Sequence, residues 1–212
     1  MPLAMKTGAR LAVVLIAIVA IVGVWWLRSG IPQAARPTSG ETIVAFGDSL
    51  VAGRGASAGH DFVSLLSERL GVRIVNAGVS GDTTASALAR VDRDVLSRNP
   101  RIVIVLLGGN DLLRQIPLDQ TFTNLGSIVD RVRQRGSAVV LVGVGTGLWV
   151  DPYSARYEAL AKRASAVLVP DILDDIMGHG NLMADQIHPN DAGYEIVARR
   201  LEPVVRDLMR TE

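Results

Sequence analysis

The sequence has no cysteine among its 212 residues. This absence excludes a disulfide framework, a thiol nucleophile and any metal site with cysteine ligands. Histidine is almost as scarce, since only His60, His179 and His188 occur. A three-histidine zinc site would need all of them, and their scatter along the chain argues against such a site.

An excess of charge of one sign is also lacking, because the formal net charge is +1. The basic residues before Gly40 all lie in or around an apolar N-terminal segment, and the rest of the chain keeps 18 basic and 21 acidic side chains. Such a weakly acidic domain has no electrostatic footprint for nucleic acid. Hydrophobic residues make up 49% and charged residues 20% of the chain, which predicts a packed globular protein rather than a disordered one.

One long hydrophobic run is present, and it lies near the N-terminus. Residues 11–27 are apolar without interruption, and as a helix they would extend roughly 25 Å, the short end of what spans a bilayer core. Lys6 and Arg10 precede the run, and Trp25 and Trp26 lie at its far end, where interfacial aromatic residues are typical. The pattern therefore predicts a transmembrane helix.

This N-terminal segment is either a cleaved signal peptide or an uncleaved membrane anchor. A secretory signal peptide needs small residues at its cleavage site, and the candidate site near Ala34-Ala35 lacks one at the upstream position. We therefore expect residues 1–28 to be an uncleaved anchor, with the rest of the chain in the periplasm or outside the cell; export after signal cleavage is the alternative. Residues 29–41 are rich in Gly, Pro, Ser and Thr, which predicts a linker before a single domain over residues 42–212.

The remaining sequence alternates β-branched runs with amphipathic helical patterns. Strands are expected over residues 42–46, 72–76, 102–107, 138–144 and 166–169, and helices over residues 61–70, 84–97, 118–135, 154–163 and 192–209. Residues 102–107 are wholly apolar, as in a strand that is buried on both faces of a parallel sheet. The repeated strand–helix units predict a three-layer α/β domain with a five-stranded parallel sheet and right-handed crossovers.

Polar, glycine-rich turns follow four of the expected strands. They cover residues 47–50, 76–82 and 108–111, and, after a longer excursion beyond the fifth strand, residues 185–190. In open α/β sheets, ligands bind beyond the carboxyl ends of the strands. We therefore expect the four turns to converge on one rim and to form the functional site.

The first and last of these turns hold a candidate nucleophile and its base. A serine hydroxyl is a weak nucleophile and needs a base within hydrogen-bond reach. His188 is the best candidate to activate Ser49, because it lies in a rim loop just before a helix. If this stretch turns helically, Asp185 lies on the same side as His188 and can hold its imidazole in the required tautomer.

The turns also supply candidate donors for the oxyanion of a tetrahedral intermediate. These donors are the backbone N–H groups of Ser49 and Gly81 and the side-chain amide of Asn110. A glycine allows close approach of the backbone to a ligand, and with these donors every role in a serine hydrolase has a candidate. The neighbouring acidic residues are expected to hold the turns rather than to carry protons: Asp48, Asp82 and Asp111.

Two other motifs compete with the Ser49 turn. Gly-Ala-Ser-Ala-Gly over residues 55–59 matches the nucleophile elbow of α/β-hydrolases. That elbow needs a strand that leads directly into its serine, and here the first strand leads into Ser49, so Ser57 is expected to be a loop serine. Residues 53–58 match a loose dinucleotide fingerprint, but Asn76 occupies the place of the confirming acid.

With these four blocks, the chain from residue 42 to about residue 208 resembles the GDSL, or SGNH, hydrolase family. The family name refers to a Ser, a Gly, an Asn and a His, which here are Ser49, Gly81, Asn110 and His188. The blocks are similar to those of the bacterial periplasmic acyl-CoA thioesterase, arylesterase and lysophospholipase subgroup. The resemblance implies a flavodoxin-like sheet, no metal and no cofactor.

The expected reaction is hydrolysis of acyl esters, acyl thioesters or lysophospholipids through an acyl-enzyme on Ser49. One alternative is a carbohydrate O-acetyl esterase that acts on cell-envelope polysaccharide, because several families share these blocks. Another is a non-catalytic or nucleotide-binding module. Residues 145–152 match nothing in the family pattern, so the substrate range is open, and Trp149 and Tyr153 can either line an acyl pocket or serve packing.

Overall fold

The computed structural model describes residue 31, residues 33–145 and residues 151–210. The chain divides into two units, Met1–Pro32 and Gln33–Glu212. The expected anchor, residues 1–28, belongs to the first unit and lies outside the described residues. Among the described residues, every helix is too short or too polar to cross a bilayer.

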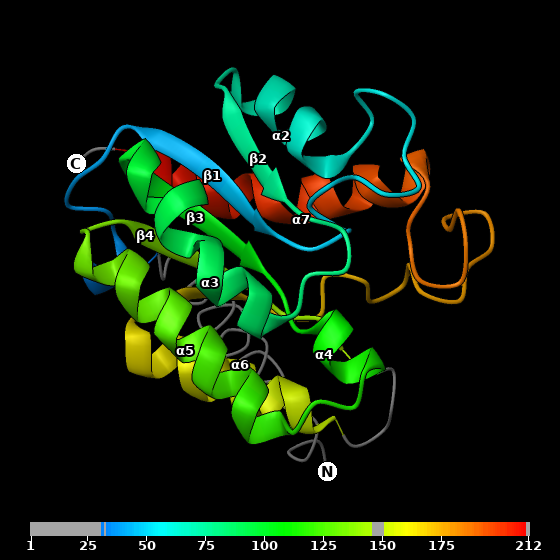
Figure 1. Ribbon diagram of the computed structural model, residues 1–212. Coiled ribbons are helices and arrows are strands. Elements are labelled where there is room, and N and C mark those ends of the chain that lie inside the picture. The colour runs from blue at the N-terminus through cyan, green and yellow to red at the C-terminus, as the bar shows by residue number, and fades with distance from the viewer. Residues whose placement is uncertain (1–30, 32, 146–150, 211–212) are drawn as a thin grey trace, which may run out of the picture. The chain divides into compact units, whose positions relative to one another are not determined.

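The second unit is built on a five-stranded parallel sheet with the order β2-β1-β3-β4-β5 (Figure 1). The strands are β1 (Thr42–Gly47), β2 (Ile74–Gly78), β3 (Pro100–Leu106), β4 (Ala138–Val142) and β5 (Val167–Val169). This confirms the predicted parallel sheet, and the strand order is that of the flavodoxin-like fold. The order reverses direction at β1, which places the turn after β1 at a topological switch point.

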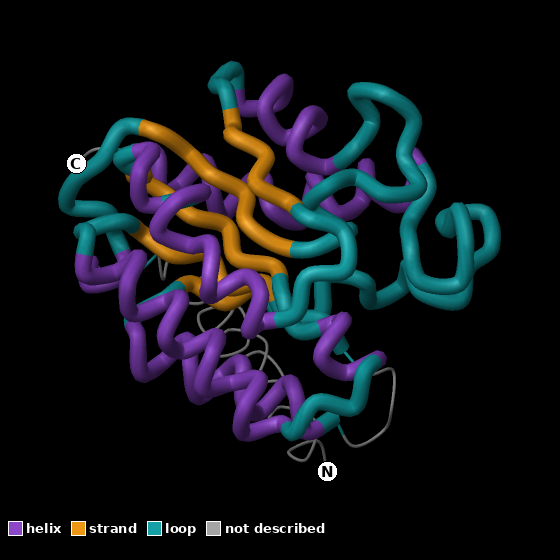
Figure 2. Tube along the Cα trace, viewed as in Figure 1, coloured by secondary structure: helices purple, strands orange, loops and turns teal. Residues whose placement is uncertain are grey.

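Helices cover both faces of the sheet (Figure 2). One face carries α3 (Thr84–Asp94), α5 (Leu118–Gln134) and α6 (Pro152–Ala164), and the other carries the packed pair α2 (Phe62–Leu70) and α7 (Asp191–Met209). Shorter helical pieces are η1 (Gln33–Ala35), η2 (Leu96–Arg98) and α4 (Gly109–Leu113). The result is the expected arrangement of a sheet between two helical layers.

The central strands are buried on both faces, which explains their apolar sequence. Every residue of β4 and the last five residues of β3 are almost completely inaccessible to solvent. Phe46, Val105 and Leu141 belong to the core under α3, α5 and α6. Because alternate residues of a strand face opposite sides, the same strands also supply the core under α2 and α7.

Strand β2 and helix α4 differ from the sequence-based expectation, and several other bounds shift by two or three residues. Strand β2 begins at Ile74 rather than at residue 72, because Gly71 ends α2 in a left-handed conformation (φ 68°) and the next two residues connect. The register with β1, from Ile43–Ile74 to Gly47–Gly78, carries β2 two residues further than expected. Helix α4 was not expected, since five residues are too few to show a helical period.

Residues 33–41, expected to be a linker, pack against the amino ends of the strands. The Thr38 N–H donates to the Gly136 carbonyl at 2.7 Å, and the Arg36 guanidinium donates to the Asp207 carbonyl at 3.0 Å. The Arg133 guanidinium donates to backbone carbonyls of η1. The compact unit therefore starts at Gln33.

Candidate active site

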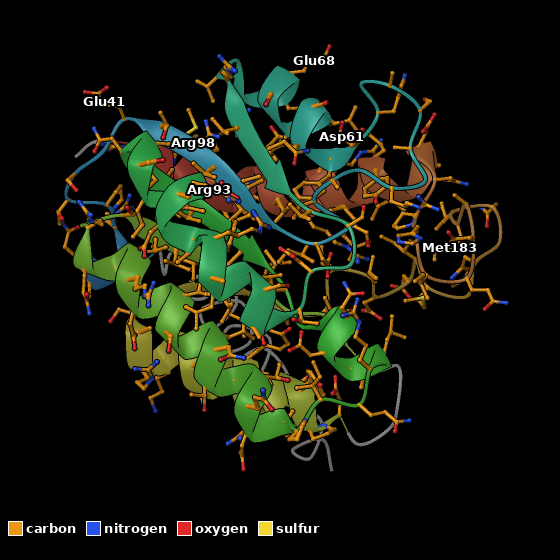
Figure 3. The ribbon with its side chains drawn as sticks, viewed as in Figure 1. Glu41, Asp61, Glu68, Arg93, Arg98 and Met183 are labelled. Atoms are coloured by element: carbon orange, nitrogen blue, oxygen red, sulfur yellow. The ribbon has the colours of Figure 1, made fainter. Side chains whose placement is uncertain are left out.

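The four polar turns lie at the carboxyl-end rim of the sheet. In Figure 3, Glu41 and Arg98 mark the end of the sheet where β1 and β3 begin, and Met183 marks the loop at the opposite end. Ser49 follows β1 by two residues, Asn110 lies in α4 directly after β3, and His188 lies shortly before α7. The topology thus brings segments that are distant in sequence to one edge.

The predicted nucleophile, base and acid form a continuous chain of hydrogen bonds. His188 Nε2 lies 3.0 Å from Ser49 Oγ. His188 Nδ1 lies 2.7 Å and 3.0 Å from the two carboxylate oxygens of Asp185. With the proton on Nδ1, the other ring nitrogen is free to accept the serine proton while the carboxylate holds the ring. The structure therefore brings all three residues together in the geometry of a charge-relay triad.

The turn that holds Asp185 beside His188 is not helical, contrary to the expectation. Asp185 Oδ1 accepts the backbone N–H groups of Ile187 at 2.9 Å and His188 at 2.8 Å, and a bridge from Met183 to Pro189 closes the loop. An aspartate that accepts the N–H groups two and three residues later forms a turn through its own side chain. This turn, and not a helical one, brings Asp185 beside His188. The backbone bond from Ile187 and the bond from His188 lower the pKa of Asp185 to about 2, so the carboxylate is ionised at neutral pH.

Asp48, beside the nucleophile, orients Asn110. Asp48 is only 2% exposed, and its two oxygens accept the Leu50 N–H at 3.0 Å and the Asn110 amide at 3.2 Å. Burial raises the pKa of Asp48 from an ordinary 3.8 to about 6, against the opposing effect of these bonds. The sequence predicts that Asp48 holds its own turn, but no local pattern indicates its contact with Asn110, which is 62 positions away.

The other two predicted donors are backbone N–H groups. Within the described part of the chain, the N–H groups of Ser49 and Gly81 donate to no other group. Gly81 has φ +85°, a left-handed conformation that favours glycine, and its carbonyl accepts a bond from Arg114 at 2.9 Å. This role of Arg114 was not predicted, because nothing in the sequence pairs it with the Gly81 turn.

The acidic residues next to these donors hold the turns together, as expected. Asp82 forms a buried ion pair with Arg90 at 2.6 Å, and Arg90 also donates to the Gly47 carbonyl at 2.9 Å. Asp111 accepts the backbone N–H of Thr84 at 2.9 Å and its hydroxyl at 2.5 Å. These bonds tie the start of α3 to the ends of β1 and β3.

An apolar cleft of about 280 Å³ opens beside Ser49, Asn110 and His188. Its apolar walls come from α4 and from the segments after β1, β4 and β5: Leu50, Leu112, Leu113, Val144, Leu173, Met177 and Ile187. Leu113, Met177 and Ile187 are 59%, 43% and 41% exposed, so the mouth of the cleft presents hydrophobic side chains to solvent. An alkyl chain fits such a lining.

The residues that line this cleft were not predicted from the sequence. Tyr153, one of the two aromatic candidates, packs in the core against Phe122 and Tyr157 and does not line the cleft. Trp149, the other candidate, lies outside the described residues. The lining residues are ordinary aliphatic side chains of loops and a short helix, which no periodicity singles out.

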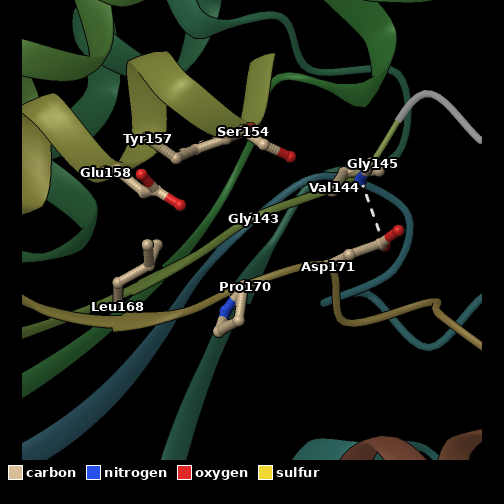
Figure 4. A pocket seen from close by; sticks show the side chains of 9 residues that line it. All are labelled: Gly143, Val144, Gly145, Ser154, Tyr157, Glu158, Leu168, Pro170 and Asp171. Carbon is tan, nitrogen blue, oxygen red and sulfur yellow. Dashed lines mark hydrogen bonds between the residues drawn. The ribbon is translucent and has the colours of Figure 1, made fainter. Parts of the chain in front are cut away.

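The bond between the Gly145 N–H and Asp171, drawn in Figure 4, belongs to two segments that reach the cleft. Asp171 Oδ1 accepts the N–H groups of Gly145 at 3.1 Å and Leu173 at 3.2 Å, which joins the segment after β4 to the segment after β5. The small pocket beside it, about 20 Å³, has room for little more than a water molecule. Val144 and Leu173 reach the acyl-sized cleft from these two segments.

The competing serine motif is not part of this site. Ser57 lies in the turns between β1 and α2, and its hydroxyl bonds the Asp191 carboxylate at 2.6 Å rather than a histidine. Among the residues that the structure describes, no three histidine or acidic side chains converge as ligands of a metal ion would.

Comparisons with known proteins agree with the four blocks. The family described as the GDSL-like Lipase/Acylhydrolase family matches residues 45–196. The Esterase TesA of Pseudomonas aeruginosa is 33% identical over 180 residues, which cover 80% of this chain and 90% of that protein. The Thioesterase 1/protease 1/lysophospholipase L1 of Escherichia coli (strain K12) is 31% identical over 182 residues, with coverage of 80% and 88%.

A solved structure extends the likeness to the fold. The crystal structure of TesA matches this chain with a TM-score of 0.74 and 33% identity, and it covers 80% of this chain and 100% of that chain. The matched family covers more than half of the chain and includes all four blocks. The chain therefore belongs to the GDSL-like lipase/acylhydrolase family and is a serine hydrolase that acts on ester bonds.

Proposed function

We propose that the protein cleaves acyl esters and thioesters, including lysophospholipids, through an acyl-enzyme on Ser49. The single observation that carries the proposal is the 3.0 Å contact between Ser49 Oγ and His188 Nε2 at the edge of an apolar cleft. The contact supplies an activated nucleophile, and the cleft supplies a place for the acyl chain.

The reaction has two halves. Ser49 Oγ attacks the acyl carbonyl carbon as His188 Nε2 takes its proton, and the tetrahedral oxyanion accepts bonds from Ser49 N–H, Gly81 N–H and the Asn110 amide. The bond to the leaving oxygen or sulfur breaks, and His188 returns the proton to the leaving group. Water then attacks the acyl-enzyme with His188 as base, which frees the carboxylic acid and restores Ser49. Asp185 stabilises the imidazolium in both halves.

The cleft favours long acyl groups over acetyl groups. Seven aliphatic side chains line it, and each buried methylene of a bound chain contributes about 0.8 kcal/mol. An acetyl group has a single methyl to bury and gains almost nothing from such a lining. The alternative, a carbohydrate O-acetyl esterase, would need polar donors and acceptors for sugar hydroxyls, and the cleft offers few.

The proposal also includes attachment to a membrane through residues 1–28, with the catalytic domain in the periplasm or outside the cell. It rests on the uninterrupted apolar run, the basic residues before it and the tryptophans at its far end. We expect the full-length protein to remain in the membrane fraction after washing with carbonate and to need detergent for release. Release by carbonate, with loss of the N-terminal residues, would instead support export after signal cleavage.

Fluorophosphonate labelling of the full-length protein in detergent tests the chemistry. The wild type should be labelled, Ser49→Ala should not, and Ser57→Ala should still be labelled to completion. With p-nitrophenyl esters, kcat/KM should rise from acetate to medium chains. No labelling of the folded wild type would sink the proposal, and activity confined to acetylated glycans would favour the O-acetyl esterase.

A further inference from the structure

The segment that follows the nucleophile packs against the loop that carries the base. Gly55 has φ +95°, and a Cβ at this position would lie 2.5 Å from the Pro189 carbonyl oxygen and 3.2 Å from His188 Cβ. The first contact is too close for any side chain and the backbone conformation is left-handed, so the fit requires glycine here. Gly55, the first residue of the motif over residues 55–59 that matches a nucleophile elbow, thus packs against the loop that carries His188.

A backbone path joins the nucleophile turn to α7. The N–H of Arg54 donates to the Ser49 carbonyl at 3.0 Å, and the carbonyl of Arg54 accepts the Tyr194 hydroxyl at 2.7 Å. The Tyr194 side chain is fully buried and stacks near Phe62. One peptide segment is therefore bonded to the nucleophile on one side and to α7 on the other.

A second link lies three residues after the base. The N–H and the hydroxyl of Ser57 both donate to the carboxylate of Asp191, at 2.7 Å and 2.6 Å. Asp191 is the first residue of α7. A serine that uses two donors on one carboxylate makes a directional contact, because both groups must be aligned at once.

The loop that carries the base is in turn bonded to α7. The Asn190 amide donates to the Asn181 carbonyl at 2.9 Å, and Gly193 packs so closely on the loop that a Cβ would lie 2.3 Å from the Leu182 carbonyl oxygen. Bonds inside the loop hold Asp185 beside His188. They do not determine the distance between His188 and Ser49, which therefore depends on other contacts. Residues 53–57 contact both α7 and this loop.

We propose that residues 53–57 are a clamp that sets the distance between Ser49 Oγ and His188 Nε2, with Ser57, Asp191 and Tyr194 as positioning residues. The inference rests on the proposed function, because that distance matters only if a proton passes between the two atoms. A displacement of 1 Å in an active site can cost roughly 100-fold in rate. None of the three residues lines the cleft, so the clamp acts on turnover and not on substrate binding.

Steady-state kinetics of the full-length protein test the clamp. Ser57→Ala and Asp191→Asn should each lower kcat roughly 10-fold and leave KM within about 2-fold, and the double variant should be no slower than the worse single variant, as residues of one contact behave. Ser57→Thr keeps the hydroxyl and should restore most of the turnover. Tyr194→Phe should act in the same direction, with thermal unfolding measured alongside to show that it folds.

The matched control is Ser64→Ala. Ser64 Oγ donates to the Asp61 carboxylate at 2.6 Å at the start of α2, the same kind of contact at another helix start, and its loss should leave kcat unchanged. A spectroscopic readout separates positioning from damage to the triad. The downfield Nδ1–H resonance of His188 should persist in Ser57→Ala, because Asp185 and His188 move as one loop.

The outcomes distinguish the clamp from the proposed function. An inactive, unlabelled wild type defeats the proposed function. An active wild type with Ser57→Ala, Asp191→Asn and Tyr194→Phe all at wild-type kcat defeats the clamp alone. A rise in KM with unchanged kcat also defeats it, because these residues would then act on substrate binding.

Discussion

The two sides of the nucleophile are held by carboxylates in opposite environments. On the base side, the Asp185 side chain is 48% exposed, bonds a histidine three residues away and has its pKa lowered to about 2. On the oxyanion side, Asp48 is buried, bonds an amide from a distant segment and has its pKa raised to about 6. Hydrogen bonds favour ionisation of Asp185, whereas burial disfavours ionisation of Asp48.

This difference shows that the two carboxylates meet different requirements of the same site. The acid of the triad must stay negative through a full proton cycle, and backbone N–H groups near solvent ensure that. The support for Asn110 must be rigid, and burial ensures that at the expense of ionisation. The base side therefore depends on a local turn, and the oxyanion side depends on the tertiary fold and on pH.

The largest effect is expected on the base side, from Asp185→Asn. The amide would bond the wrong tautomer of His188 and would not stabilise the imidazolium, so kcat should fall on the order of 10⁴-fold. The measurement is kcat for a p-nitrophenyl ester beside Asp174→Asn, an exposed aspartate of the preceding segment, which should stay at the wild-type rate. A loss below about 10-fold would mean that the base works without its carboxylate.

The oxyanion side should respond less strongly. Asp48→Asn replaces one of two acceptors with a donor, so Asn110 would no longer be held in place, and kcat should fall by roughly 100- to 1000-fold, as for loss of one oxyanion donor. Asn110→Ala should have a similar effect, and the double variant should add little. Fully additive losses would show that Asp48 acts independently of Asn110.

The two carboxylates change the stability of the fold with pH in opposite directions. The folded-state pKa of Asp48, about 6, lies above its ordinary 3.8, so its contribution to stability is present below pH 3.8 and is lost as pH rises to 6, by at most roughly 3 kcal/mol. Asp185, with a folded-state pKa of about 2, contributes stability above pH 3.8 that is lost as pH falls towards 2.

Urea unfolding between pH 4 and pH 7 measures the Asp48 effect. The stability of Asp48→Asn relative to the wild type should increase across this range, because only the wild type gains a buried charge. Parallel stability curves for the two proteins would show that Asp48 does not titrate there. Turnover of the wild type should rise over the same pH range while its stability falls, since ionised Asp48 is the better acceptor for the Asn110 amide.

The smallest effect should come from Arg114→Ala. Arg114 supports the Gly81 turn by a single bond to a carbonyl near the surface, which is worth about 0.5–1 kcal/mol, or 2- to 5-fold in kcat. Arg114→Lys should recover part of this loss. A 100-fold loss with an unchanged fold would indicate that Arg114 itself contacts the substrate.

What was predictable from the sequence follows the same division. The proximity of Ser49, Asp185 and His188 was predictable because Ser49 lies in a short motif at a strand end, while Asp185 and His188 lie in a short motif just before the last helix, and the carboxyl ends of parallel strands meet at one rim. The Asp48–Asn110 contact, the Arg114 support and the aliphatic cleft were not found, because they depend on how loops pack across the rim. The shift of β2 was missed for a similar reason, since pairing with β1 overrode its local pattern.

Residues 33–39, which pack against the amino ends of the strands, affect how the protein can be produced and attached. A recombinant fragment that starts at Gly40 would leave Arg133 and Gly136 without partners from residues 33–39, so a robust fragment starts at Gln33 or earlier. A tag or solid support attached ahead of Gln33 joins the chain at the end of the sheet opposite Ser49. Immobilised through that end, the enzyme keeps its cleft open to substrate flowing past the support.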